Sequence, residues 1–316
     1  MIVNPRFDCK YLKLRKPKYN YHIEYFEQAR DALSYIAKSC APYSERKVGI
    51  PEYICDVVPE AFKKCGWIVK YFASENYAEI TTKDLDPLEN EGISLLLIPH
   101  YFGILQKLDP ITSWCRKHNI YLIEDCAHLP LVAEEEPRYG NYGDAAIFSL
   151  RKFSPYCIAV MRINNMSMMK NDCGEKKEAL YRTSVIRKIK EKVKKAITEH
   201  TNFDMIMQKR KNNYLYLKEI LPSSSYAFLH EDDQCVMGAL AFPIKLNHPP
   251  VGTGTGTGTG EIENFGYFWP RFPKEIDNQS DNYVGNKVFL LPIHQSLTLL
   301  SIERYVSVLR QSGMLK

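Results

Sequence analysis

The sequence lacks the cysteine spacing that a zinc site or a disulfide framework requires. Its nine cysteines form no CxxC pair and no cluster at ligand spacing. They are Cys9, Cys40, Cys55, Cys65, Cys115, Cys126, Cys157, Cys173 and Cys235. Scattered, odd-numbered cysteines are typical of a reducing compartment, where they act as small apolar side chains. We therefore expect no metal centre and a cytoplasmic location.

Long apolar runs are also missing. The longest falls far short of the roughly 20 residues that span a membrane, and the N-terminal MIVNPRFDCKYLKLRK has no apolar core of the kind that directs secretion. The net charge of +5 is spread along the chain, and the 21 tyrosines do not alternate with basic residues as in single-strand binders. We expect no membrane or nucleic-acid partner, and 316 residues are enough for one large or two moderate domains.

Apolar strands alternate with helices over the first half of the chain. The expected strands are 47–54, 67–73, 94–103, 120–125 and 145–150, and the expected helices are 24–40, 56–66 and 108–119. The strands are continuous apolar runs, which is typical of a parallel sheet covered by helices on both faces. The predicted fold class is therefore α/β, and such sheets bind ligands beyond the carboxyl ends of their strands.

The second half of the chain is organised differently. Residues 174–218 are charged and helix-rich, which we interpret as a solvated helix face, with an electrostatic patch as the alternative. The elements expected after this segment are strands at 239–246 and 287–294 and an amphipathic helix at 298–311. The sequence predicts a large domain over 1–218 and a smaller C-terminal α+β domain over 219–316.

The run VGTGTGTGTG (251–260) fits neither domain. Its alternating glycines give it no reason to fold, so we expect a flexible loop at 252–260. A phosphate-binding glycine loop is followed by a helix and usually a lysine, and EIENFG supplies neither.

Polar side chains gather where the predicted strands end. Asp125 and His128 close one strand, His100 lies near the end of another, and Lys152 follows a third. Charges at the ends of buried strands are costly unless something binds them. The sequence therefore predicts a ligand site at the carboxyl edge of the sheet.

Six segments form an ordered series of motifs. They are QARDALSYIA (28–37), IPEYICDVVPEAFKKCGW (50–67), LLIPHYFGILQKLDPI (96–111), LIEDCAH (122–128), YGDAAIFSLRKFSP (142–155) and LPIHQSLTLLSIERYVSVL (291–309). In this order the chain resembles the DegT/DnrJ/EryC1/StrS family of pyridoxal-phosphate-dependent sugar aminotransferases. The resemblance implies the aspartate aminotransferase fold (fold type I), with a large cofactor-binding domain and a smaller C-terminal domain.

The resemblance implies pyridoxal 5'-phosphate as the cofactor and gives two residues catalytic roles. Lys152 would attach to the cofactor and move a proton between substrate and cofactor. Desolvation would favour the neutral amine that this role needs. Asp125 would keep the cofactor's pyridine nitrogen protonated. Considered alone, Lys152 could be a surface lysine and Asp125 a helix N-cap. The two residues together, at this spacing, favour the cofactor site.

The cofactor phosphate has its own implied contacts. Ser149 matches a family serine that helps to hold the phosphate. The helix opening at Ala29, Arg30 and Asp31 would direct backbone N–H groups toward the same phosphate. Arg30 would add a fixed charge, and its alternative role is a solvated first-turn residue.

The ring and the substrate side involve four more residues. His128 matches a position that reaches the cofactor's phenolic oxygen or ring face, and Tyr53 matches an aromatic near the ring. His294 and His100 are the candidate substrate contacts. A structural histidine, an ordinary buried tyrosine and a surface histidine are the alternatives for His128, Tyr53 and His294.

The chain departs from the family pattern near both ends of the cofactor site. Ala29 stands where the family has a glycine that eases backbone approach to the phosphate. After the lysine, Tyr156, Cys157, Ile158 and Ala159 replace a glycine-rich turn, and a β-branched Ile158 would resist positive φ. The small domain is also short for the family.

The favoured function is transfer of an amino group from an amino acid, glutamate by resemblance, to a keto sugar nucleotide in a homodimer. Sugar dehydration is one alternative, but the dehydrating relatives replace the lysine by histidine, so Lys152 argues against it. The altered turn at 156–159 is the main support for a catalytically impaired relative or non-catalytic binding scaffold. An unrelated α/β protein with similar strand ends is the remaining alternative.

Overall fold

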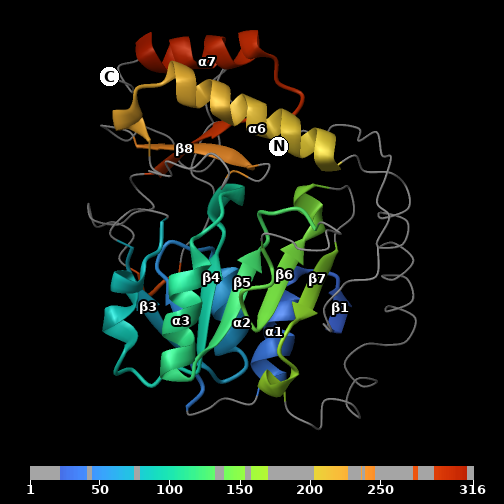
Figure 1. Ribbon diagram of the computed structural model, residues 1–316, viewed down its shortest axis with the longest axis vertical. Helices are drawn as coiled ribbons and strands as arrows, with labels where there is room; N and C mark the ends of the chain where they lie inside the picture. Colours follow the sequence, from blue (N-terminus) through green and yellow to red (C-terminus); the bar gives the residue numbers. More distant parts are fainter. Residues whose placement is uncertain are drawn as a thin grey trace.

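Figure 1 shows the computed structural model of the chain. The structure describes residues 22–40, 45–74, 79–131, 139–153, 158–169, 203–226, 236, 239–245, 273–276 and 288–311. The expectations for the run at 252–260, for Tyr156 and Cys157, and for the helical stretch before residue 203 therefore lie outside the described residues.

A seven-stranded sheet forms the larger part of the protein, with the order β1-β7-β6-β5-β4-β2-β3. Its strands are β1 (His22–Phe26), β2 (Lys47–Pro51), β3 (Ile68–Phe72), β4 (Leu95–Pro99), β5 (Tyr121–Cys126), β6 (Ala145–Ser149) and β7 (Ala159–Ile163). The pairs from β3 through β6 are all parallel, and β7 is antiparallel to both of its neighbours. The prediction of a mostly parallel α/β sheet is confirmed.

Helices cover both faces of this sheet. They are α1 (Ala29–Ser39), α2 (Val57–Lys63) and α3 (Leu108–His118), with short 3₁₀ helices η1 (Thr82–Leu88), η2 (Tyr101–Gly103), η3 (Leu150–Lys152) and η4 (Met166–Met168). In β5, Ile123 packs into the core cluster that holds α1 and α2, whereas Leu122 packs into the cluster that holds α3. Successive strand residues thus serve opposite layers, which explains why the strand sequences are continuously apolar.

The predicted helix at 24–40 is wrong over its first residues, because residues 24–26 belong to strand β1. Phe26 is buried in the same core cluster as Ala32, Leu33 and Ile36 of α1, so its position also fits a helical period. Because β1 pairs with β7, residues 24–26 form a strand rather than the first turn of a helix. The helix begins at Ala29.

A second unit lies above the carboxyl ends of the large sheet (Figure 1). It contains α6 (Phe203–Ile220), η6 (Ser223–Ser225), the antiparallel strands β8 (Ala241–Lys245) and β9 (Val288–Pro292), and α7 (Leu299–Gln311). The strands and helix expected after residue 239 are present, and the expected domain boundary at 218–219 falls in the last turn of α6. Among the described residues, no helix has the length and apolar content needed to cross a membrane.

The strand register brings the predicted site residues to one edge. Asp125 of β5 lies beside Pro99 of β4, and Ser149 at the end of β6 lies opposite Ala159 of β7. Ala159 in turn pairs with Phe26, three residues before α1 begins. The ends of β4, β5 and β6 and the start of α1 therefore share the edge that faces the second unit.

Candidate active site

Lys152 ends the short helix η3, directly beyond the buried strand β6. The turn is closed by backbone bonds from Leu150 N–H to the Ile158 carbonyl and from Phe153 N–H to the Leu150 carbonyl, both 2.9 Å. The pKa of Lys152 is lowered from 10.5 to about 8, first by burial and then by the charge of Arg151, whereas Cys55 and Asp125 act in the opposite direction. A substantial neutral fraction of this amine is therefore present at mildly alkaline pH, unlike that of an ordinary lysine.

The rate at which Lys152 attaches to an added aldehyde should rise with pH and level off above about 8. The neutral amine is the nucleophile, and its fraction grows as pH passes the lowered pKa. Stopped-flow absorbance after mixing the protein with pyridoxal phosphate measures this rate, with Lys152→Ala as the blank. A rate that keeps rising to the ordinary lysine pKa would contradict the lowered pKa.

Asp125 lies one residue before the end of β5. Its Oδ1 accepts the Ala127 N–H at 3.0 Å, and its backbone carbonyl accepts the His100 N–H at 3.0 Å. Burial raises the pKa of the Asp125 carboxyl, while the Ala127 bond and the nearby His100 and Lys152 side chains act in the opposite direction. Because Asp125 and Lys152 each shift the pKa of the other, the carboxyl and the amine lie within electrostatic reach across the strand ends.

His128 is buried in the turn that follows β5 and has a defined tautomer. Its Nδ1 accepts the Phe102 N–H at 3.0 Å, and its ring stacks on the Phe102 ring at 6.1 Å. Burial holds the pKa of His128 well below 6.5, and the charges of Lys152 and Arg151 lower it further. The ring is thus neutral, with its proton on Nε2, which makes Nε2 a hydrogen-bond donor.

The loop between β4 and α3 has an unusual backbone that supports His128. Phe102 adopts a left-handed φ of 57° and Gly103 follows at 81°. A Cβ on Gly103 would lie 2.9 Å from the His128 carbonyl oxygen and 2.9 Å from Ala239 Cα. The glycine of the His-x-x-Gly segment is therefore required for close packing between this loop, His128 and the second unit.

Tyr53 and Cys55 follow the end of β2. Tyr53 is buried, with its ring 5.4 Å from Tyr101 and 6.2 Å from Phe102. Burial raises the pKa of the Cys55 thiol, which is electrostatically coupled to Lys152. Sequence reasoning missed Cys55, and the only available signal was its position two residues after Tyr53.

Ser149 and the start of α1 lie at the edge of the sheet where β6 ends. Ser149 is buried at the end of β6, and α1 begins without a side-chain cap. The Asp31 N–H donates to the Gln28 carbonyl at 3.0 Å, which leaves the N–H groups of Ala29 and Arg30 for a ligand. Ala29 and Asp31 are partly exposed. The exposed Arg30 side chain turns back to its own helix start, with Nε donating to Gln28 Oε1 at 2.7 Å.

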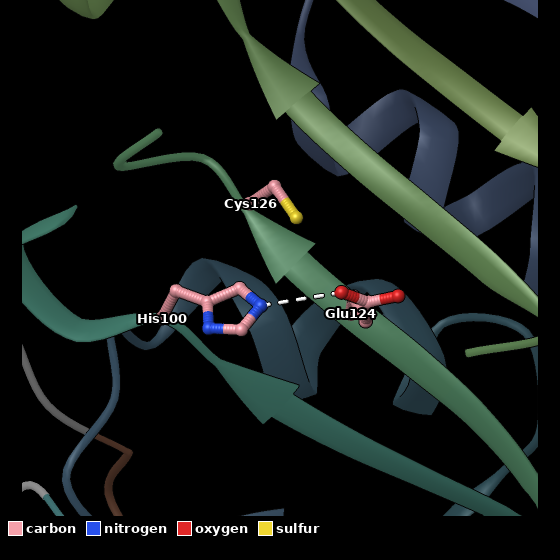
Figure 2. Close-up of side chains that lie close together, drawn as sticks. All are labelled: His100, Glu124 and Cys126. Carbon is pink, nitrogen blue, oxygen red and sulfur yellow. Dashed lines mark hydrogen bonds and ion pairs between the residues drawn. The ribbon is translucent and has the colours of Figure 1, made fainter. Parts of the chain in front are cut away.

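Glu124 forms a buried network behind the site (Figure 2). Its side chain has no exposure, and Oε1 accepts the N–H groups of Tyr142 and Gly143 at 2.7 Å each. Its Oε2 accepts the Gly140 N–H at 2.7 Å and lies 3.3 Å from His100 Nε2. Glu124 therefore fixes the loop that leads from β5 to β6.

His100, a predicted substrate contact, belongs to this network instead. It is 1% exposed, and its Nδ1 accepts the Gln106 N–H at 3.0 Å, so Nε2 carries the proton that faces Glu124. Possible ligand atoms of His100, Glu124 and Cys126 lie within 4.8 Å of one another. The ring nitrogens of His100 and the carboxylate oxygens of Glu124 already have hydrogen-bond partners within the protein. We therefore interpret the cluster as a buried support for Asp125 rather than as a metal site.

Glu124→Gln should lower the free energy of unfolding by about 3 kcal/mol, because an amide nitrogen would face backbone N–H donors in a buried site. Urea denaturation followed by circular dichroism measures the loss. Glu60→Gln, on the exposed side of α2, is the matched control and should change little. Equal stability of the two variants would show that the network contributes little.

The second unit contributes His294 and Arg210 above η3. His294 Nδ1 accepts the Ser296 N–H at 3.3 Å, and burial and then the Arg210 charge lower the pKa of His294 to about 4. The Arg210 guanidinium carbon lies 5.2 Å from the centre of the Phe153 ring, next in the chain to Lys152. Arg210 was missed because the segment 174–218 was interpreted as a solvated face.

The altered turn after Lys152 does not strain the described residues. Ile158 is buried and is not among the described residues with positive φ, and Ala159 opens β7. Ile158 therefore does not adopt the positive φ that a β-branched residue was expected to resist. An antiparallel strand follows instead.

The segment that matches a known protein family covers the candidate site. Residues 77–157 match the sequence model of the DegT/DnrJ/EryC1/StrS aminotransferase family, a span that contains Asp125, His128, Ser149 and Lys152. GDP-perosamine synthase of Vibrio cholerae is 21% identical over 145 residues, which are 46% of this chain and 39% of that protein. The match thus spans about two fifths of the curated relative's length.

Solved structures share the fold along nearly the whole chain. Helicobacter pylori PseC, an aminotransferase of pseudaminic acid biosynthesis, has a TM-score of 0.61 at 16% identity and covers 92% of this chain and 86% of its own. NtdA of Bacillus subtilis with bound PMP has a TM-score of 0.64 at 13% identity, covering 92% and 73%. The E. coli GDP-4-keto-6-deoxy-D-mannose-3-dehydratase with hydrated PLP has a TM-score of 0.57 at 14% identity, covering 93% and 87%.

These findings confirm both the resemblance and the fold class. The chain has the fold of the pyridoxal-phosphate-dependent aminotransferases of fold type I, and its residues 77–157 match the sequence model of the DegT/DnrJ/EryC1/StrS aminotransferase family.

Proposed function

We propose that this protein is a pyridoxal-phosphate-dependent aminotransferase that moves an amino group from an amino acid to the keto group of a nucleotide sugar. One observation carries the proposal: Lys152 and Asp125 are electrostatically coupled at the strand-end edge. Both lie inside the segment that matches the family. Such a pair meets the two chemical needs of the cofactor, an amine to attach and a carboxylate for the ring nitrogen.

The residues present fit pyridoxal phosphate. Lys152 would attach to its aldehyde and Asp125 would bind its ring nitrogen, while His128 Nε2–H would donate to the ring oxygen. Ser149 and the uncapped start of α1 would hold the phosphate, with Tyr53 beside the ring. When bound, the cofactor supplies an electron-withdrawing ring that stabilises negative charge on the substrate carbon.

The chain's own groups then account for the proton movements. The Lys152 amine, with its lowered pKa, would accept the proton that leaves the substrate carbon and would later donate it again. The Asp125 carboxylate holds the proton on the ring nitrogen by electrostatic attraction. The neutral His128 ring keeps a fixed donor in place without adding charge beside Lys152.

The substrate classes and the assembly rest on the family. GDP-perosamine synthase and PseC are named for sugar products, which supports a keto sugar nucleotide as acceptor. Glutamate as the amino donor, a homodimer and a cytoplasmic location belong to the same proposal. In the same proposal, His294 of the second unit contacts the substrate.

Sugar dehydration is disfavoured, although a dehydratase shares the fold. By the family resemblance, dehydrating members carry histidine where this chain has Lys152. A lysine keeps the covalent attachment and proton transfer that transamination needs.

The absorption spectrum of the purified protein tests the proposal. Added pyridoxal phosphate should produce a visible band, absent in Lys152→Ala, and L-glutamate should convert that band to the spectrum of the amine form. Protein that stays colourless with excess cofactor would support the non-catalytic scaffold instead.

A further inference from the structure

A polar hollow lies at the end of the large sheet opposite Lys152. It encloses about 410 Å³ between the end of α3, the start of β5, the loop before β6 and the segment after β7. Asp144, in its wall, precedes β6, whereas Lys152 follows that strand, which separates the two by roughly 15 Å. Figure 1 shows this end of the sheet facing away from the second unit. The hollow is therefore separate from the candidate active site.

The wall of the hollow is held in place by buried hydrogen bonds. Glu124 accepts the N–H groups of Tyr142 and Gly143 at 2.7 Å each. From the other side, Asn164 Nδ2 donates to the carbonyls of Gly140 and Gly143 at 2.9 Å each. The loop before β6 is thus fixed on both sides. A ligand that enters the hollow meets a preformed surface and does not have to order the loop.

The charges around the hollow favour an uncharged ligand. Asp144 lies in the wall, with Oδ2 accepting the Leu122 N–H at 2.8 Å and Oδ1 accepting from Asn165 Nδ2 at 2.7 Å. This carboxylate and the carbonyl end of α3 oppose an anion, whereas Arg116, in the last turn of α3, opposes a cation. The Cys115 thiol stays protonated, because burial and then the Asp144 charge raise its pKa to about 12. A reactive thiolate is therefore excluded as the purpose of the hollow.

Planar polar groups and one aromatic ring line the hollow. Arg116 and Asn119, at the end of α3, both line it and are exposed. Asn141 adds an amide whose orientation is fixed, because its Oδ1 accepts from Arg162 Nη1 at 2.6 Å. Tyr142 is 38% exposed. Guanidinium and amide groups bond to neighbouring hydroxyls, and an exposed aromatic ring packs against the apolar C–H face of a sugar.

We propose that this hollow is a second binding site, outside the catalytic one, for an uncharged sugar ring of the pyranose type. Its volume lies within the roughly 300–1,000 Å³ that is usual for small-molecule sites. A free sugar and one unit of a glycan share this chemistry. The proposal goes beyond amino-group transfer and does not depend on it.

Saturation-transfer difference NMR on the full-length protein treated with pyridoxal phosphate tests the proposal. The probes are the methyl α-pyranosides of glucose, mannose and galactose, together with maltotriose. At least one should give a saturable signal. A lower dissociation constant for maltotriose than for methyl α-D-glucopyranoside assigns the site to a glycan, and the opposite order assigns it to a free sugar.

Three variants locate the bound sugar. Tyr142→Ala, Arg116→Gln and Asn119→Gly should each weaken binding about tenfold, because each removes a stacking or hydrogen-bonding group. Glycine is chosen at Asn119 because that residue has a φ of 55°, which glycine adopts without strain. Lys117→Gln is the matched control, since Lys117 is exposed on the same turn of α3 but does not line the hollow. It should leave binding unchanged.

Three outcomes overturn the proposal. The first is that none of the saccharides gives a signal. The second is equal binding in the unaltered protein and the three variants, which places the sugar elsewhere, the active site included. The third is displacement of the glycoside by sodium sulfate, which assigns the hollow to anions. If Tyr142→Ala does not fold, the two exposed positions, Arg116 and Asn119, decide the matter.

Discussion

Lys152→Ala should lower the rate of amino-group transfer by about four orders of magnitude or more, because it removes both the attachment to the cofactor and the proton carrier. The unaltered amine combines a position beyond β6 with a pKa lowered to about 8 by burial. No other described residue combines these properties with coupling to Asp125. Single-turnover kinetics with L-glutamate measures the loss.

Lys152→Arg is the matched control for charge. Arginine keeps a positive charge near Asp125 but stays protonated, so it neither attaches nor accepts a proton. We expect it to be as inactive as Lys152→Ala, and added methylamine to restore part of the activity only in Lys152→Ala. Substantial activity in Lys152→Arg would show that Lys152 contributes charge alone.

Asp125→Asn should lower the transfer rate by about a thousandfold, because an uncharged amide no longer stabilises a proton on the cofactor ring nitrogen. The fold should survive, since the Asn carbonyl oxygen can still accept the Ala127 N–H that Asp125 now accepts at 3.0 Å. Kinetics of the first half-reaction, together with a thermal melt, separate a chemical loss from unfolding.

Asp125→Glu is the companion variant. It keeps the charge but displaces the carboxylate by one methylene, and it should retain more activity than Asp125→Asn. An Asp125→Asn protein within tenfold of the original rate would remove Asp125 from the chemistry and leave it as a turn residue after β5.

Much of the fold could be predicted from local sequence, and strand β7 shows why some of it could not. β4 and β6 are almost wholly apolar and buried, and β5 begins with the buried apolar run Tyr121–Ile123 before its two acidic residues. β7 is just as buried but carries Arg162, which donates to Asn141 Oδ1 at 2.6 Å and lies over the Phe148 ring. Only the tertiary structure supplies those partners, so its sequence does not read as a core strand.

The site shows the same limit. That Asp125, His128 and Lys152 share one edge of the sheet could be predicted, because parallel strands bring their carboxyl ends together. His100 has the same kind of position, but its ring turns inward to Glu124, and sequence does not reveal that direction. Arg210 of α6 lies over the Phe153 ring, and no local pattern separates it from the lysines beside it.

The proposed function depends on the covalent attachment of pyridoxal phosphate to Lys152. Borohydride reduction of the protein treated with pyridoxal phosphate, followed by peptide mapping, should place the pyridoxyl group on Lys152 in full stoichiometry. The label should weaken when glutamate is added before reduction. Labelling spread over several surface lysines, or absent from Lys152, would contradict the account.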